Sequence, residues 1–362
     1  MDSIQSICKK ISSLLPTLDS EKLEIEVKFR EIEPFDFNLL LNYLKKKSEP
    51  KIRYIKDYYK NERRWSEMEE EIFETSKTTL YRKILKDLKF TLSDEMFQKS
   101  EVPKTFDFIR VKKRKSFIDG NISIDLTQVE EKLEIELEII DPKKYNWREF
   151  SDKITFYHNL ILQSRSEIIE KCNFYLSDGK LINRSETIDY SLISRPRDLI
   201  KRDVTTPRSI LRGMTVSIKA DGLQYFLLFL QTGVYLVNSK NSIKRIGEEV
   251  TELTGSMFAG ELVNRSRYLK ADSFQTENIY LPFDTISYMN RPMVNQNYLK
   301  RISYHDKLLD LEFSDEVEMK IYKKNISQLH TTSEAFYQGF RSCYRERENI
   351  GYMDDGYIFT PV

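Results

Sequence analysis

The chain has 362 residues, 40% of them hydrophobic and 32% charged, with a formal net charge of +1. This length and composition predict two packed domains and exclude a mainly disordered protein. The scattered cysteines and histidines exclude a zinc-finger spacing or a disulfide framework, and no apolar run reaches the ~18 residues of a membrane-spanning helix. Because the N-terminus does not resemble a signal peptide, we expect a cytoplasmic protein without a membrane partner.

Short strands dominate the first half of the chain, between helical segments. Apolar residues at helical spacing predict an amphipathic helix from Ser3, and a second helix follows through residues 37–46. Residues 51–140 alternate in short stretches and are expected to be mostly strands, whereas a long helix begins near Asn146. The polar stretch that follows this helix has no clear period and contains turn residues. We therefore predict a first domain at 1–180, a linker at 181–205 and a second domain at 206–362.

Acidic residues alternate with apolar ones on two of the expected strands. In the stretch KLEIELEII, Glu134, Glu136 and Glu138 alternate with leucine and isoleucine, and in LEIEVKFR Glu24 and Glu26 do the same. Since successive side chains of a strand point to opposite faces, each strand has one apolar and one acidic face. An antiparallel sheet with one face in water gives the same alternation, so the period alone does not separate a wet face from a lined cavity.

A third strand concentrates basic residues. FIRVKKRKSF places Arg110, Lys112 and Arg114 on one face, and NISIDLTQV places Asp125 opposite isoleucines. Like charges at neighbouring positions destabilise a solvated sheet, whereas they suit a cavity that holds ligands of opposite sign. Carboxylates are hard ligands for Mg²⁺ or Mn²⁺, and arginine and lysine donate to phosphate oxygens. A closed barrel would unite both sets as a metal-dependent polyphosphate site. The alternative for KKRK, a nuclear localisation patch, is disfavoured by its alternation with apolar residues.

The ordered set of Glu24-x-Glu26-x-Lys28, an Arg-x-Lys-x-Arg strand, IDLT and a closing Glu-x-Glu-x-Glu strand resembles the triphosphate tunnel metalloenzymes over about residues 20–140. The match is closest to RNA triphosphatases of fungal, poxviral and related large-DNA-virus type. The resemblance implies an α+β fold with an antiparallel eight-stranded β tunnel and flanking helices. It also implies in-line displacement by positioning and electrostatics, without a covalent intermediate.

The same resemblance assigns roles to residues of the tunnel. The implied ligands of Mg²⁺ or Mn²⁺ are Glu24, Glu26 and Glu138, while Glu136 and Glu134 would orient the attacking water. The implied triphosphate-binding residues are Arg110, Lys112 and Arg114. Further candidates for the tunnel interior are Lys28 and Asp125, followed by Arg63, Arg64 and Lys83, for which the strand register is unassigned.

A lysine before an Asp-Gly pair marks the second half of the chain. In VSIKADG, Lys219 stands at the end of an apolar strand, just before Asp221 and Gly222. An ordinary hairpin turn accounts for Asp-Gly without giving the lysine a role. A lysine is a nucleophile only when deprotonated, which burial or nearby cations favour.

Three later landmarks follow in order: Gly260-Glu261, Phe283-Asp284 and Asp355-Gly356. With KADG, this series resembles the covalent nucleotidyltransferases, meaning mRNA guanylyltransferases and ATP- or NAD-dependent ligases. The resemblance implies an ATP-grasp-like, ligase-type α+β domain in which Lys219 attacks the α-phosphate of GTP to give lysyl-GMP. It also implies that Glu261 contacts the ribose, Phe283 stacks on the base and Asp355 helps hold the metal, while Asp221 and Gly222 shape the loop that presents the lysine.

The series departs from the family pattern at three points. Gln224 stands where the family usually has arginine, and Ala259 stands where it often has aspartate. The sequence ends at Val362, before the later Lys-x-Lys strand and the OB fold. We therefore expect that the sequence is the N-terminal portion of a longer chain and that this portion by itself transfers GMP poorly.

A tunnel triphosphatase followed by a nucleotidyltransferase is the order expected of an mRNA capping enzyme. It resembles those of poxviruses, other cytoplasmic large DNA viruses and yeast cytoplasmic linear plasmids. The expected partners are 5′-triphosphate RNA, GTP and a methyltransferase domain or subunit. Two other interpretations stay open: a nucleotide, thiamine or inorganic triphosphate hydrolase with a ligase-like second domain, and a degenerate scaffold that only binds RNA or a capping partner.

Overall fold

The computed structural model describes residues 3–18, 22–61, 63–69, 71–102, 104–179, 187–189, 213–264, 278–309, 311–313, 319–329, 333–347, 350, 352 and 354–362. The chain divides into two compact units, Met1–Ser164 and Arg165–Val362. The division falls within the long helix α3 (Trp147–Leu176), before the boundary predicted near residue 180. Most of the predicted linker at 181–205 lies outside the described residues, so the linker stays a prediction.

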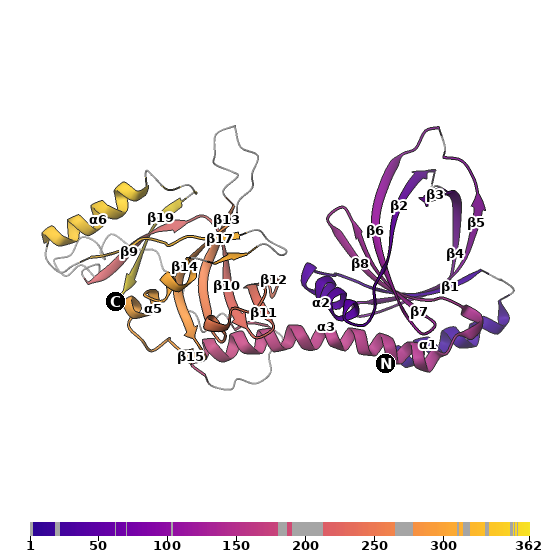
Figure 1. Ribbon diagram of the computed structural model, residues 1–362, viewed down its shortest axis with the longest axis horizontal. Helices are drawn as coiled ribbons and strands as arrows, with labels where there is room; N and C mark the ends of the chain where they lie inside the picture. The colour runs from indigo at the N-terminus through magenta and orange to yellow at the C-terminus, as the bar shows by residue number, and fades with distance from the viewer. Residues whose placement is uncertain are drawn as a thin grey trace. The chain divides into compact units, whose positions relative to one another are not determined.

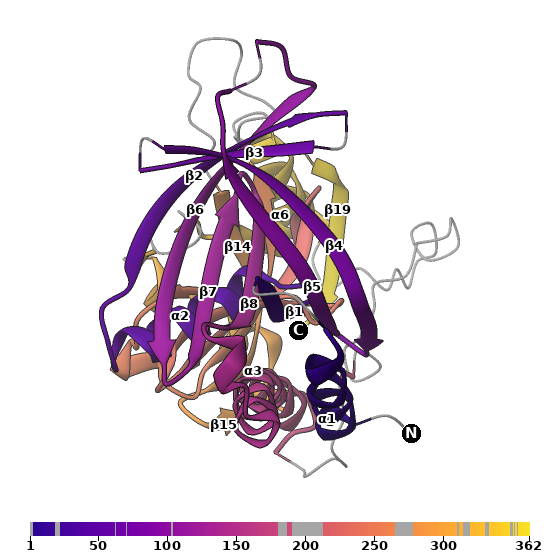
Figure 2. The same ribbon diagram turned by 90° about the vertical axis from the view of Figure 1, so that its right-hand side faces the viewer.

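The first unit is a closed antiparallel barrel (Figures 1 and 2). Around the barrel the strands follow the order β1-β5-β4-β3-β2-β6-β7-β8, and the pairing of β1 with β8 closes the circle. This closure confirms the predicted eight-stranded tunnel. The strands are β1 (Leu23–Phe29), β2 (Lys51–Lys60), β3 (Arg63–Met68), β4 (Glu71–Leu85), β5 (Leu88–Lys99), β6 (Phe108–Asp119), β7 (Ile122–Val129) and β8 (Lys132–Ile139).

Helices cover the outside of the barrel where its strands are apolar. The helices α1 (Ile4–Leu14) and α2 (Pro34–Lys45), with the first part of α3, lie alongside β1, β7 and β8 (Figure 1). Val27 of β1 and Leu137 of β8 are fully buried in one core with Leu40 of α2 and Ile154 of α3. The apolar faces of these strands therefore point outward into a helix-covered core, and their acidic faces point into the barrel. The interpretation as an ordinary wet sheet face is wrong.

The second unit is an α+β arrangement of two sheets. The larger sheet has the order β12-β11-β10-β13-β14-β17-β16, with β15 paired to β14, and the smaller sheet has the order β18-β9-β19. The strands are β9 (Met214–Ala220), β10 (Leu223–Leu230), β11 (Gly233–Asn238), β12 (Ile243–Gly247), β13 (Met257–Asn264), β14 (Asn278–Tyr288), β15 (Arg291–Pro292), β16 (Glu312–Phe313), β17 (Met319–Ile321), β18 (Ile326–Gln328) and β19 (Asp354–Pro361), and the helices are α5 (Tyr298–Ile302) and α6 (Ser333–Arg347). Short 3-10 helices cover Leu15–Thr17, Pro142–Lys144, Thr251–Leu253 and His305–Leu308.

A buried tyrosine ties the middle strands of the larger sheet together. The hydroxyl of Tyr280 in β14 donates to the carbonyl oxygens of Tyr225 and Phe258, at 3.1 and 3.0 Å. A Cβ at Gly260 would lie 2.8 Å from the carbonyl oxygen of Leu281, so only glycine lets the strands approach this closely. This glycine fixes the backbone next to Glu261. No helix in the described part of the chain is long and apolar enough to span a membrane.

Candidate active sites

The carboxylates of the first and last strands meet at the seam that closes the barrel. The register places Glu26 directly opposite Glu138 and Lys28 directly opposite Glu136. Across the next pair of strands, Asp125 of β7 also lies opposite Glu136. Since cross-strand partners share one face of a sheet, these groups line the interior together. Tertiary structure thus brings together the acidic residues predicted from two strands far apart in the sequence.

Of these carboxylates, that of Glu138 is the least stabilised by positively charged neighbours. No hydrogen bond or ion pair with the described residues holds it, although Arg114 exerts a weaker attraction. Burial raises the pKa of Glu138 to about 8, and the carboxylates of Glu24 and Asp125 contribute to the shift. Burial also raises the pKa of Glu26, although Lys77 opposes the shift. These carboxyl groups are therefore poorly stabilised in their charged form.

The chemistry of Glu24, Glu26 and Glu138 fits a divalent cation. Carboxylate oxygens are preferred ligands of Mg²⁺ and Mn²⁺, and a cation would stabilise the charged form of a carboxyl group whose pKa is raised by acidic neighbours. The amine of Lys77 in β4 supplies positive charge here by forming ion pairs with both Glu24 and Glu26. Within the described ranges, no three acidic, histidine or cysteine side chains form a ready-made metal cluster. The ligand assignment therefore stays a prediction.

The basic residues predicted to bind phosphate all lie inside the barrel, and each is paired with a carboxylate. Arg110 donates to Glu134 at 2.7 Å. Arg114 donates to Asp125 at 2.9 Å and to Glu136 at 3.4 Å. Lys112 forms an ion pair with Asp57. A polyphosphate could exchange with these carboxylates as the partner of three cations that already point inward.

Lys28 links the two glutamates proposed to orient water. Its amine lies 2.9 Å from Glu134 and 3.0 Å from Glu136. Burial works against the charge of Lys28, but the two carboxylates raise its pKa above the ordinary value. Although burial would raise the pKa of Glu134, the hydrogen bonds and charges of Lys28 and Arg110 hold it below its usual range. The predicted interior positions of Lys28 and Asp125 agree with these contacts.

Sequence reasoning missed Asp57, Lys77 and Glu95 as interior residues. Asp57 could have been found, since it shares one face of its strand with Arg53 and Ile55. Lys77 and Glu95 face each other in the β4–β5 register, but their strands carry no repeated charge type that would mark an inward face.

The barrel register also shows which way the side chains of Arg63, Arg64 and Lys83 point, for which the sequence alone assigned no strand register. Arg64 points inward and pairs with Glu95 at 2.8 Å. The inward positions considered for Arg63 and Lys83 are wrong. Arg63 comes directly before the inward-pointing Arg64, so its side chain points outward and is 70% exposed. Lys83 lies opposite Phe90, which is buried in the core outside the barrel, so Lys83 is also on the outer face.

In the second unit, Lys219 stands at the end of β9 and pairs with Asp355 of the adjacent strand β19. The hydrogen bond to Asp355 raises the pKa of Lys219, so the amine is protonated in this state. Asp221 and Gly222 turn the chain from β9 into β10. A Cβ at Gly222 would lie 2.9 Å from the carbonyl oxygen of Leu262, so β13 leaves room only for glycine. The Asp-Gly turn that follows Lys219 thus packs closely against β13.

A buried lysine that the sequence did not reveal completes this site. Lys324 lies in the loop between β17 and β18, with its amine 3.6 Å from Glu261 and 5.8 Å from the ring centre of Phe283. Burial lowers the pKa of Lys324 and raises that of Glu261. Because Lys324 lies in a loop, it belongs to no strand or helix period that could have identified it in the sequence. Gln224 lies directly opposite Glu261 across β10 and β13, but the charged partner of Glu261 is Lys324.

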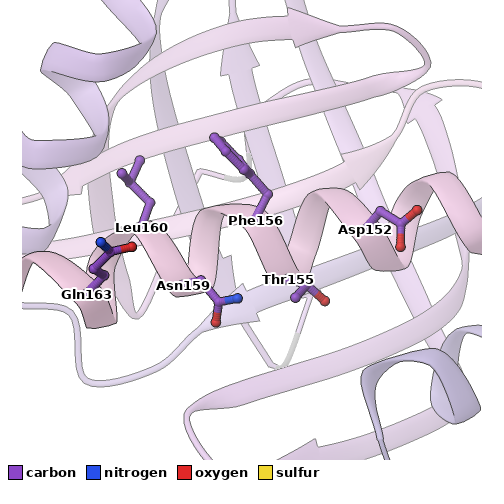
Figure 3. A pocket seen from close by; sticks show the side chains of 6 residues that line it. All are labelled: Asp152, Thr155, Phe156, Asn159, Leu160 and Gln163. Carbon is purple, nitrogen blue, oxygen red and sulfur yellow. The ribbon is translucent and has the colours of Figure 1, made fainter.

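A surface pocket of about 360 Å³ lies elsewhere in the first unit. Its lining side chains all come from α3 (Figure 3), and they are Asp152, Thr155, Phe156, Asn159, Leu160 and Gln163. One carboxylate and no cation line it, so it lacks the paired charges found inside the barrel.

Residues 194–362 match a protein-family model described as the catalytic domain of mRNA capping enzyme. This match agrees with the resemblance to mRNA guanylyltransferases that KADG and the later landmarks indicated.

Solved structures also show similarity to the chain. The triphosphatase of the mimivirus capping enzyme is 16% identical, covers 43% of this chain and 97% of its own, and has a TM-score of 0.35. The S. pombe RNA triphosphatase, solved with the Spt5 CTD, is 16% identical over 46% of this chain and 92% of its own, with a TM-score of 0.35. A putative adenylyl cyclase from Hippeastrum, described as having a dominant triphosphatase activity, is 11% identical over 38% and 87%, with a TM-score of 0.26. No curated protein sequence matches the chain.

Proposed function

We propose that this chain caps RNA in two steps: removal of the γ-phosphate from a 5′-triphosphate end, then transfer of GMP from GTP through a lysyl-GMP intermediate. The observation that carries the first step is the closed barrel in which Glu26 and Glu138 meet, with Arg110, Lys112 and Arg114 on the same interior. The second step is supported by the family match over residues 194–362 and by the position of Lys219 at the Asp-Gly turn.

For the first step, Glu24, Glu26 and Glu138 would hold Mg²⁺ or Mn²⁺, which when bound polarises phosphate oxygens. Arg110, Lys112 and Arg114 would exchange their carboxylate partners for oxygens of the triphosphate and neutralise charge as the γ-phosphate leaves. This exchange would release Glu134 and Glu136 from the arginines, and the two carboxylates, still held by Lys28, would orient a water molecule and accept its proton. Until phosphate binds, the ion pairs would thus keep each group inside the barrel.

For the second step, the amine of Lys219 must first lose the proton that Asp355 now stabilises. The lysine nitrogen then bonds to the α-phosphorus of GTP, the bond to the β-phosphate breaks and pyrophosphate leaves. A terminal oxygen of the diphosphate RNA next attacks the same phosphorus and releases Lys219. Glu261 and Phe283 would hold the ribose and base, next to Lys324. A methyltransferase domain or subunit, in the cytoplasm, would act on the product.

The experiment is release of γ-phosphate from a 5′-triphosphate RNA with Mg²⁺ or Mn²⁺, compared with release from free ATP and GTP. We expect metal-dependent release from RNA by the parent and loss in Glu26→Ala and Glu136→Ala. Glu131→Ala is the matched control, because Glu131 lies exposed in the turn between β7 and β8. An inactive parent, or full activity in both interior variants, would overturn the first step. Faster release from free nucleotides would favour the alternative nucleotide hydrolase.

A further inference from the structure

The outer face of β2 and β6 carries basic residues that the tunnel does not use. In the stretch KKRK, Lys112 and Arg114 point into the barrel, so Lys113 and Lys115 point outward from the same strand. The register of β6 with β2 places Lys113 opposite Tyr54 and Lys115 opposite Ile52. β2 and β6 lie side by side in one wall of the barrel (Figure 2).

Large apolar side chains on this wall are exposed beside the lysines. Tyr54 is 66% exposed, Val111 54% and Ile52 49%. Val111 lies opposite Lys56, so every apolar residue of the set faces a lysine across the two strands. The amine of Lys113 lies 5.7 Å from the ring centre of Tyr54. Helices cover the apolar faces of β1, β7 and β8, whereas these side chains remain open to solvent.

Lys113 and Lys115 of this wall are not balanced by acids. Lys45, at the C-terminal end of α2, lies near enough to Lys115 to repel it, as does Lys113. Among the described residues, no carboxylate pairs with Lys45, Lys113 or Lys115. Lys56 differs from these lysines, because it lies opposite Glu67 of β3, which attracts it and accepts a hydrogen bond from Tyr58 at 2.6 Å. The wall therefore has a local excess of positive charge that a polyanion would relieve.

We infer that this outer wall, defined by Ile52, Tyr54, Lys56, Val111, Lys113 and Lys115, binds the single-stranded part of an RNA whose triphosphate end enters the barrel. This inference rests on the proposed function. Lysines supply point charges for backbone phosphates, and an exposed aromatic ring gives bases a stacking platform that tolerates any sequence. An acidic protein segment would use the lysines but would have no need of the exposed Tyr54 ring.

The position of the wall sets a requirement on RNA length. At about 3.4 Å per residue, Lys113 lies roughly 20 Å along β6 from the strand end at Asp119 and roughly 17 Å from the other end at Phe108. An RNA whose 5′ end is inside the barrel must therefore pass the rim before it reaches the wall. Binding by this surface should appear only in RNAs longer than a few nucleotides.

The test measures binding of 5′-triphosphate RNAs by fluorescence anisotropy, comparing a trinucleotide with an RNA of about 20 nucleotides, which exceeds the usual site of one single-strand-binding fold. The variants are the double change Lys113→Gln and Lys115→Gln, and Tyr54→Ala. The matched control is Lys9→Gln with Lys10→Gln, two exposed lysines of α1. We expect the double variant to weaken the long RNA about tenfold and to reduce the slope of log K against log salt by about 1.4, since each phosphate contact on a single strand contributes about 0.7.

The trinucleotide should bind all variants like the parent, with γ-phosphate release from it unchanged. Tyr54→Ala should weaken the long RNA without changing the salt slope, because stacking releases no counterions. Unchanged affinity and slope in the double variant would overturn the inference and leave the wall to an acidic protein partner. A parent that binds long RNA through this wall but releases no phosphate from it would overturn the triphosphatase step and not the surface.

Discussion

Glu26 and Glu138 face each other across β1 and β8, at the strand pairing that closes the barrel. Like charges directly opposite each other destabilise a sheet. The chain nevertheless places them at closure, where burial raises the pKa of both carboxyl groups. A cation that binds only the folded state would stabilise it. Closure of the barrel and metal binding are therefore expected to be linked.

Replacing Glu138 by glutamine should stabilise the metal-free protein at neutral pH. The pKa of Glu138 is raised from 4.5 to about 8 in the folded state, so that state holds a proton which the unfolded chain loses. The free energy of unfolding of the parent should fall as pH rises from about 4.5 to 8, and Glu138→Gln should remove this contribution. Thermal unfolding with chelator at several pH values measures it, with Glu131→Gln as control. Parallel profiles for the parent and Glu138→Gln would contradict the linkage.

Replacing Lys77 by methionine should tighten Mn²⁺ binding. Lys77 pairs with Glu24 and Glu26, so a metal that uses these carboxylates must displace its amine. We expect a several-fold lower dissociation constant for Mn²⁺, measured from the signal of free Mn²⁺ in electron paramagnetic resonance. Lys99→Met is the matched control, because Lys99 pairs with Glu71 at the exposed surface of β4 and β5. Weaker Mn²⁺ binding by Lys77→Met would show that the amine does not compete with the ion.

Replacing Asp355 by asparagine should separate the effect of this carboxylate on the pKa of Lys219 from its effect on the labelling of Lys219 by GTP. Loss of the carboxylate removes the hydrogen bond that raises the pKa of Lys219, so the amine should react with an acylating reagent at lower pH than in the parent. Labelling by GTP should fall, because Asp355 is the proposed metal ligand of this site. Asp354→Asn is the control, since the neighbouring Asp354 contacts Arg347 at 2.8 Å instead. Unchanged acylation in Asp355→Asn would contradict the assigned role of the ion pair.

His305 should make the second unit sensitive to acid. Burial lowers the pKa of His305 from 6.5 to about 4, so the unfolded chain binds a proton at higher pH than the folded protein does. Its contribution to the free energy of unfolding should be lost as pH falls from about 6.5 toward 4. Urea unfolding of the parent and of His305→Gln at several pH values tests this. An equally steep loss of stability in both proteins would place the acid sensitivity elsewhere.

The sequence alone determined where several of the strands lie and which chemistry each of them carries. Glu24, Glu26, Glu134, Glu136 and Glu138 were found because a strand exposes alternate residues on one face, and this local rule needs no knowledge of neighbours. Lys219 was found because KADG is followed in order by Gly260-Glu261, Phe283-Asp284 and Asp355-Gly356, a series that resembles the covalent nucleotidyltransferases. The strand period and the order of the motifs did not show where these residues lie in the folded chain.

Only the tertiary structure decided which face is the inside. The strand period is the same for a wet face and for a tunnel wall, and it was the packing of α1, α2 and α3 on the apolar side that turned the glutamates inward. Barrel closure and register then brought Lys77 to Glu24, and loop packing brought Lys324 to Glu261. These contacts join residues far apart in the sequence, and their charges become partners only when the backbone closes. A local sequence pattern cannot reveal these partners, because they depend on how the strands pair and not on the residues of any one strand.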